Sequence, residues 1–292
     1  MFGFEKKATP KADPDLKSVL EQLVRNEIPI TLNKANGSVT GSRFGGKPAT
    51  PDHFKWPRFE AKNYDGEIAD RPLSFLCQIN LEEIASFDKD SLLPHKGLLL
   101  FFYEQESACW GFDPKDHGCS RVFYFENTDQ LALAELPEDL KEEYRVKEYA
   151  LDFCANHSFP SFEELECHSD VDCDWDAYDE ALEQTDYDME SERHKLLGYA
   201  NLIQGEMLTE CERISRGMYC GDSKSYQSLS DQEKADIKKA ASDWVLLFQM
   251  TSIEDKDYEL MFGDAGNLYF YIRKDDLKNK NFDNVHFSLQ CF

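Results

Sequence analysis

The sequence lacks long apolar runs, a recognisable signal peptide and, over a long central stretch, any positive charge. The longest apolar stretch, GLLLFFY at 97–103, has the length of a strand and not of a membrane span. The opening residues, MFGFEKKATPKADPDLK, contain no apolar segment, so we expect no signal peptide. No Lys or Arg occurs between Glu148 and Glu192. We therefore expect a cytoplasmic protein that does not associate with membranes.

Basic residues are scarce throughout: 32 Lys and Arg against 57 Asp and Glu give a net charge of −25. Such a charge repels phosphate backbones and anionic lipids, so nucleic acid and membranes are poor candidates as partners. The acidity either keeps the protein soluble or attracts a basic protein partner. The cysteines number nine, which is odd, and thiols of a cytosolic protein are normally reduced, so we expect no disulfide framework. They include no Cys-x-x-Cys pair, which argues against a zinc site.

Apolar material is sufficient for a sizeable core, since 41% of the 292 residues are hydrophobic. Ser230 and Glu233 form a capping box that predicts a helix over 230–243, and a second helix is expected over about 175–184. Apolar runs predict strands at 73–79, 97–103, 121–127, 244–250, 267–272 and 285–292.

One order of features occurs twice: a basic residue followed by Gly, a strand ending in Gln, a Gly-led aromatic strand and a last strand. The matched stretches are SRFGG (42–46) with HKLLG (194–198), LCQI (76–79) with LFQM (247–250), GLLLF (97–101) with GNLYF (266–270), and VFY (122–124) with VHF (285–287). We predict an α+β fold with internal duplication: two related, mostly-β halves with a few helices, in a pseudo-twofold arrangement. The expected divisions of one compact unit are a flexible tail at 1–14, a first half at 15–127, an acidic connector at 128–192 and a second half at 193–292.

These motifs, together with the Pro-rich stretch that follows the first Gly pair, resemble the YwqG-like family of uncharacterised bacterial proteins, also described as DUF1963. The resemblance covers roughly residues 30–292. It implies an α+β fold of two related repeats in a soluble bacterial protein, and it implies no activity, cofactor or catalytic residue. The long acidic middle segment departs from the family pattern, so its role lies outside what the resemblance implies.

Two amides stand at matched positions near the ends of apolar strands, Gln78 and Gln249. Burying an amide costs free energy unless it is hydrogen-bonded. The pair therefore forms either a structural amide network or two ligand-facing amides at the junction of the halves.

Further candidates for a junction site lie in or next to the matched stretches that contain Gly. The first group can hold an anion in a backbone nest or can form only a turn, and Pro48 after Lys47 rules out a phosphate-binding P-loop. The second group is a possible His–Asp pair, although Asp264 can equally bond turn amides. The residues are Arg43, Gly45, Gly46 and Lys47 in the first group, and His194 and Asp264 in the second.

A weak calcium candidate lies in the acidic segment. Counted from Asp172, carboxylates fall at loop positions 1, 3, 5 and 12, but Ala177 stands where an EF-hand loop needs Gly. The carboxylates are Asp172, Asp174, Asp176 and Glu183. We expect no other metal site and no cofactor.

No motif of nucleophilic catalysis is recognisable, so the sequence leaves open whether the protein is an enzyme. We favour a non-enzymatic protein-interaction or regulatory module, and the acidity favours a basic protein as its partner. The alternative is an enzyme or a protein that binds a small ligand or anion, with its site at the junction of the halves and its ligand unknown.

Overall fold

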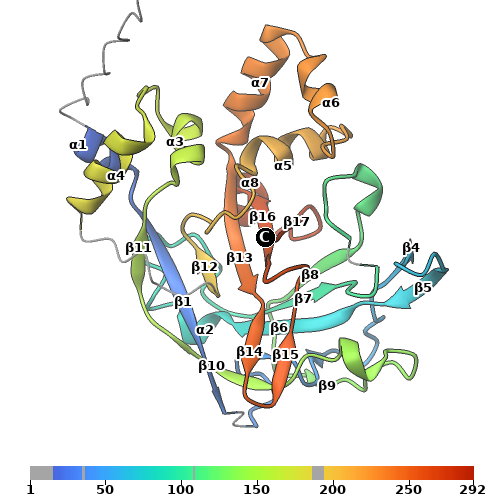
Figure 1. The fold of residues 1–292 in the computed structure, drawn as a ribbon. Helices are drawn as coiled ribbons and strands as arrows, with labels where there is room; N and C mark the ends of the chain where they lie inside the picture. Colours follow the sequence, from blue (N-terminus) through green and yellow to red (C-terminus); the bar gives the residue numbers. More distant parts are fainter. Residues whose placement is uncertain (1–15, 35–36, 108, 186–193) are drawn as a thin grey trace, which may run out of the picture.

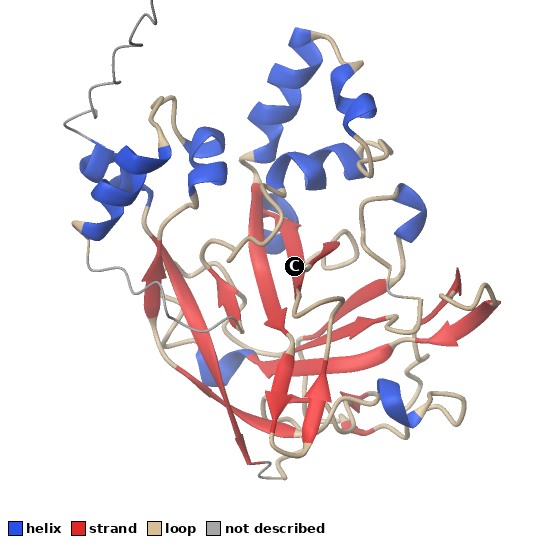
Figure 2. Ribbon diagram, viewed as in Figure 1, coloured by secondary structure: helices blue, strands red, loops and turns tan. Residues whose placement is uncertain are grey.

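The structure is a computed structural model that describes residues 16–34, 37–107, 109–185 and 194–292. This part of the chain is mostly β, with eight α-helices and a large, nearly closed antiparallel sheet (Figure 1). Figure 2 shows that most helices gather on one side of the strands. The helices are α1 (Leu16–Leu23), α2 (Leu81–Ile84), α3 (Phe162–His168), α4 (Trp175–Glu183), α5 (Leu208–Ser215), α6 (Ser223–Gln227), α7 (Asp231–Ala241) and α8 (Lys274–Lys278), with 3-10 turns at Pro114–Asp116 and Glu142–Tyr144.

The main sheet runs in the order β17-β16-β13-β12-β1-β10-β2-β6-β7-β8, and β11 also pairs with β1. Its strands are β1 (Arg25–Lys34), β2 (Arg43–Phe44), β6 (Ser74–Asn80), β7 (Leu98–Tyr103), β8 (Ser120–Phe125), β10 (Tyr149–Phe153), β11 (Asn156–Ser158), β12 (Lys195–Leu197), β13 (Trp244–Thr251), β16 (Asn267–Arg273) and β17 (His286–Gln290). Three small two-stranded sheets stand apart from it: β3 (Ala49–Thr50) with β9 (Ala132–Leu133), and the hairpins of β4 (Arg58–Lys62) with β5 (Ile68–Pro72) and of β14 (Ile253–Asp255) with β15 (Tyr258–Leu260).

One hydrophobic core fills the inner face of this sheet. The ring of Phe101 in β7 lies 4.7 Å from that of Phe248 in β13 and 5.2 Å from that of Phe270 in β16, measured between centroids. At the outer edges, Tyr103 stacks on Phe287 of β17 at 4.5 Å. Strands from the two ends of the sheet thus meet across one interior, which buries their inner faces. Separate clusters cover the outer faces of β7 and β16, so both strands are buried on both sides.

Several predicted elements are present. The helix α7 begins after Ser230, whose side chain and that of Glu233 form the predicted capping box. The helix α4 begins after Asp174, which accepts a hydrogen bond from the amide of Ala177. The segment 128–192, predicted as a connector, contributes β10 and β11 to the main sheet. The predicted tail at 1–14 lies outside the described residues.

A buried ion pair joins β1 to β12. The Nζ atom of Lys195 lies 2.9 Å from Oε2 of Glu27, and both side chains are at most 2% exposed. The amide of Asn156 donates to the other carboxylate oxygen of Glu27 at 3.2 Å. Charges taken out of water are stable only when each has such a partner, so the pair fixes where β12 sits against β1.

Replacing Lys195 with methionine would leave the Glu27 carboxylate buried without its cation. We expect Lys195→Met to lower the free energy of unfolding by about 3–5 kcal/mol in urea denaturation. Lys47→Met is the control, because Lys47 pairs with Glu135 at the surface, where losing a pair costs less than about 1 kcal/mol. Equal stability of the two variants would contradict a structural role for the buried pair.

Candidate functional site

The two matched glutamines are buried and bonded within the chain. Oε1 of Gln78 accepts from the amide of Ala49 at 2.9 Å, and its Nε2 donates to the carbonyls of Val39 and Gly41. Gln249 accepts from the amide of Asn201 at 2.9 Å and donates to Oδ1 of the same residue at 3.0 Å. Both amides hold loops against the ends of strands, as the structural-network alternative predicts.

The glycine turn after β2 uses its polar groups internally. The amides of Gly45 and Gly46 donate to the carbonyls of Leu76 and Val146, at 2.8 and 3.0 Å. Both glycines have positive φ, and a Cβ at Gly45 would meet a carbonyl oxygen at 2.2 Å. Because the amides already have partners, an anion could bind here only by displacing them.

The charged candidates near this turn also lie apart. Arg43 is buried and donates to the carbonyls of Ser38 and Val39, and burial lowers the pKa of its guanidinium. Lys47 is at the surface with Glu135. The structure therefore does not gather these side chains around one opening.

His194 and Asp264 do not form a pair. His194 is buried, its Nδ1 accepts from the amide of Thr251 at 3.1 Å, and burial lowers the pKa of its imidazole to about 4. Asp264 is exposed at a turn. No hydrogen bond or ion pair joins them in the described part of the chain, and none of the eight junction candidates lines the clefts reported below.

The four calcium candidates lie in α4 and in the segment before it, where they make different contacts. Asp174 caps α4, and Asp172 faces a cleft beside it. Within the described residues, no three acidic, histidine or cysteine side chains are grouped so as to hold a metal ion. The carboxylates at the four predicted positions therefore do not form a coordination cage.

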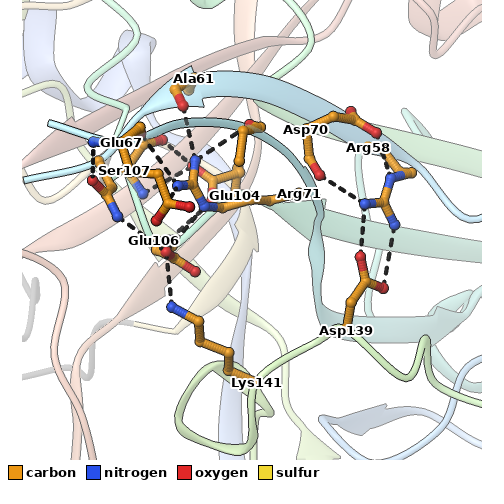
Figure 3. Close-up of polar contacts among 12 residues, drawn as sticks. Arg58, Ala61, Glu67, Asp70, Arg71, Glu104, Glu106, Ser107, Asp139 and Lys141 are labelled. Carbon is orange, nitrogen blue, oxygen red and sulfur yellow. Dashed lines mark hydrogen bonds and ion pairs between the residues drawn. The ribbon is translucent and has the colours of Figure 1, made fainter. Parts of the chain in front are cut away.

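A dense polar network on the first half is closed in the same way (Figure 3). Arg71 contacts Glu106 at 3.0 Å, which Lys141 also reaches at 2.9 Å, and Arg58 lies between Asp70 and Asp139. The cavity within it has a volume of only about 20 Å³, enough for at most a water molecule. Its contacts attach the β4–β5 hairpin to neighbouring segments and leave no space for a ligand.

Unsatisfied polar groups point instead to the outer face of β16 and β17 and to the helices over it. Six buried side-chain atoms have no hydrogen-bond partner in the described part of the chain. Five of them belong to α3, α5, β16 or β17, and buried polar groups without partners are rare enough to require an explanation. The five atoms are Glu164 Oε2, His168 Nε2, Arg213 Nε, Tyr271 OH and His286 Nε2.

A cleft of about 630 Å³ opens beside α3, and we call it the acidic cleft. Its charged lining consists of five carboxylates and one lysine, with apolar contacts from Phe162, Leu165 and Val171. The single cation, Lys238 of α7, lies 3.2 Å from Glu166 and is neutralised by it. The carboxylates are Glu163, Glu166, Asp170, Asp172 and Glu206.

An aromatic pair borders the acidic cleft. The ring of Phe162 stacks on Trp175 of α4 at 4.4 Å and 29°. Trp175 is 50% exposed, which is unusual for the largest apolar side chain. An exposed indole face beside carboxylates is suited to a guanidinium or ammonium group, through cation–π attraction and ion pairing together.

Two acids near the acidic cleft are partly or fully out of water. Burial, with repulsion from Glu206, raises the pKa of Glu164 to about 8. Burial also raises the pKa of Glu206, whose carboxylate accepts from the amide and hydroxyl of Thr209. Sequence reasoning missed both residues, because a glutamate in an acidic stretch gives no sign of its burial.

The class of the protein follows from these features: a mostly-β chain with one large antiparallel sheet and an acidic cleft under its helices. The chain belongs to the family described as "Domain of unknown function (DUF1963)", whose sequence model matches residues 42–291. The match confirms the predicted DUF1963 membership, and the description assigns no activity. No curated protein matches the chain. In the described residues, no helix has the length and apolarity needed to cross a membrane.

The raised pKa of Glu164 predicts a pH dependence of stability. The proton on this carboxyl stabilises the fold fully below the ordinary pKa of 4.5, and that contribution is lost as pH rises through about 8. Because glutamine has no proton to lose, we expect Glu164→Gln to flatten the decline in unfolding free energy across this interval. Chemical denaturation at several pH values measures the slope.

The neighbouring Glu163 is the matched control for this experiment. It is exposed on the same helix, so Glu163→Gln should keep the wild-type slope. A Glu164→Gln slope equal to that of the control would mean that Glu164 ionises normally in the folded protein.

Proposed function

We propose that the protein is a non-enzymatic interaction module that binds a basic segment of a partner protein in the acidic cleft. The observation that supports this most is the lining of the cleft, in which five carboxylates face one already paired lysine. A positively charged segment would be attracted by both the local charge and the net charge of −25. The aromatic pair at the rim adds a contact surface of the type enriched at binding hot spots.

The alternative, a small-ligand, anion or enzymatic site at the junction of the halves, has less support. Its candidate amides bond to backbone within the chain, and its histidine is buried against Phe44 with ring centroids 5.0 Å apart. A ligand there would have to displace existing hydrogen bonds, whereas the acidic cleft is open. A cytoplasmic location and a bacterial source remain predictions from the sequence alone.

Binding of fluorescein-labelled octalysine, measured by fluorescence anisotropy, tests the interaction proposal. We expect the triple variant Glu163→Gln, Asp170→Asn, Asp172→Asn to weaken binding by about tenfold, because each lost charge pair contributes roughly 0.5 kcal/mol. Trp175→Ala should weaken it further through the lost cation–π contact.

The matched control removes the same number of exposed acids from the β14–β15 hairpin. This second triple variant is Glu254→Gln, Asp257→Asn, Glu259→Gln, and all three positions are exposed. It has the same net charge as the first, so it reports the loss of non-specific attraction. Equal weakening by the two triple variants would mean that the peptide senses only overall charge and that the cleft is not its site.

We also propose that the fold arose by internal duplication, with the first strands of the two copies exchanged. The sheet order supports this, because β8-β7-β6-β2-β10 from one edge corresponds to β17-β16-β13-β12-β1 from the other. The register agrees in detail: Gln78 pairs with Arg43 and Leu100, and Gln249 pairs with Lys195 and Tyr269. The pairing register shifts at the same place in both strands that carry a matched glutamine. The shift lies at 75–77 in β6, just before Gln78, and at 246–248 in β13, just before Gln249.

The buried charges support the same correspondence. Pro29 of β1 pairs with Lys195, and Ala150 of β10 pairs with Arg43. If Lys195 corresponds to Arg43, then Pro29 corresponds to Ala150, and Glu27, two residues earlier, corresponds to Glu148. Glu27 pairs with Lys195, and Glu148 raises the pKa of Arg43 against the lowering effect of burial. A basic residue beside the first Gly turn thus faces a glutamate of the adjoining strand in both copies.

The last pair of matched stretches requires a correction. Val122 lies opposite Phe101, and Phe287 lies opposite Phe270, so Val122 corresponds to Phe287 and not to Val285. A shift of two residues keeps the same side chains on the same face, which is why the apolar pattern did not reveal the error.

An experimental structure tests the duplication. The rotation that superposes β6 and β7 on β13 and β16 should also bring β2 onto β12 and β10 onto β1, with Arg43 falling on Lys195. A rotation that leaves β10 and β1 apart would contradict the proposed exchange.

A further inference from the structure

A second cleft has a volume of about 460 Å³ and a lining that is separate from that of the acidic cleft. It opens where α5 ends and where β13, β16 and β17 come together. Its lining is rich in hydrogen-bond donors, and we call it the donor cleft. The lining includes His117, Trp244, Arg273, Asp276 and His286.

The guanidinium of Arg273 is held in one orientation at this cleft. Its Nη2 donates to Oε2 of Glu212 and to the hydroxyl of Ser215, the latter at 3.0 Å. The group lies over the ring of Trp244, 4.5 Å from the centroid. Its Nε and Nη1 have no hydrogen bond to the part of the chain that the structure describes. The two nitrogens lie on opposite sides of the guanidinium, so they do not act as one fork, and Nη1 is the donor that remains for a ligand.

The anchor of Arg273 is itself buried and shared. Glu212, with a side chain 4% exposed, also accepts from Nε1 of Trp244 at 3.0 Å and from Nε of Arg216 at 2.7 Å. Two arginines share this carboxylate, and the second negative charge near them is that of Asp276. Asp276, the one carboxylate in the lining, accepts from the amide of Asn281 at 2.6 Å.

His286 supplies an unpartnered nitrogen to the same lining. Its Nε2 is buried and has no hydrogen-bond partner within the described residues, and neither does the hydroxyl of Tyr271, which lies opposite it in the register. Burial, with His117 nearby, lowers the pKa of His286 to about 4, so its imidazole is neutral near pH 7. A neutral imidazole still donates one hydrogen bond.

We propose that the donor cleft binds the oxyanion of a small ligand, a carboxylate or a phosphate, with Arg273 and His286 as its donors. The guanidinium donates to one oxygen through Nη1, and the imidazole donates to another through Nε2. The volume admits a small molecule and not a folded partner. This site shares no lining residue with the acidic cleft, and the proposal does not depend on the proposed function.

Isothermal titration of the full chain with sodium phosphate, and separately with sodium acetate, tests the proposal at an ionic strength fixed with sodium chloride. We expect saturable binding of at least one anion. Arg273→Gln should weaken it by about tenfold or more, because a hydrogen bond to a charged partner is lost. His286→Phe, which keeps an aromatic ring and removes Nε2, should weaken it by about three- to tenfold.

Arg58→Gln is the control, because Arg58 is also held between carboxylates but lies on the first half of the chain. It should bind the anion as the wild type does. Binding of phosphate alone would indicate a phosphate ester as ligand, and binding of acetate alone a carboxylate. Circular dichroism checks that each variant folds. If Arg273→Gln does not fold, His286→Phe is the variant that tests the site.

Two results would overturn the proposal. One is that the wild type binds neither anion saturably. The other is that folded Arg273→Gln, or folded His286→Phe in its place, binds as tightly as the Arg58→Gln control.

Discussion

The insertion of β1 between β10 and β12 is the constraint on which the rest of the structure depends. Without β1 the main sheet would separate into a piece of four strands, β17-β16-β13-β12, and a piece of five strands, β10-β2-β6-β7-β8. Each piece would have an unpaired inner edge. The ion pair of Glu27 with Lys195 sets the position of β12 against β1, and a one-residue slip would place both charges on the wrong face. Continuity of the sheet in turn brings Phe101 and Phe248 into one interior.

The two ends of the sheet share an inner face but differ on their outer faces. On the first half, Phe102 and Phe123 are covered by the aromatic rings of Phe54 and Trp56. At the β17 end of the sheet, the outward positions of β16 are an asparagine, two tyrosines and an arginine, and those of β17 are a histidine, a serine and a glutamine, under helices α5 and α7. The apolar cover closes one face, and the face with polar side chains borders clefts.

Much of the fold was predictable from the sequence, but little of the candidate site was. Apolar runs identify strands because they report burial directly, and Ser230 with Glu233 identifies a helix because capping is local. The acidic cleft combines Phe162, Glu206 and Lys238, which meet only through tertiary packing. Gln78 was singled out for its unusual position, yet only the structure reveals that backbone groups satisfy it.

The pairing of β1 with β12 also has a consequence for biosynthesis. Lys195 follows Glu27 by 168 residues, so the first strand leaves the ribosome long before its partner is translated. At roughly 5–20 residues per second, the wait is about 10–30 s. During that time, Ile28, which is buried in the finished sheet, lacks the strand that carries its partner Leu196. The nascent chain therefore passes through an interval in which binding by a chaperone would protect it from aggregation.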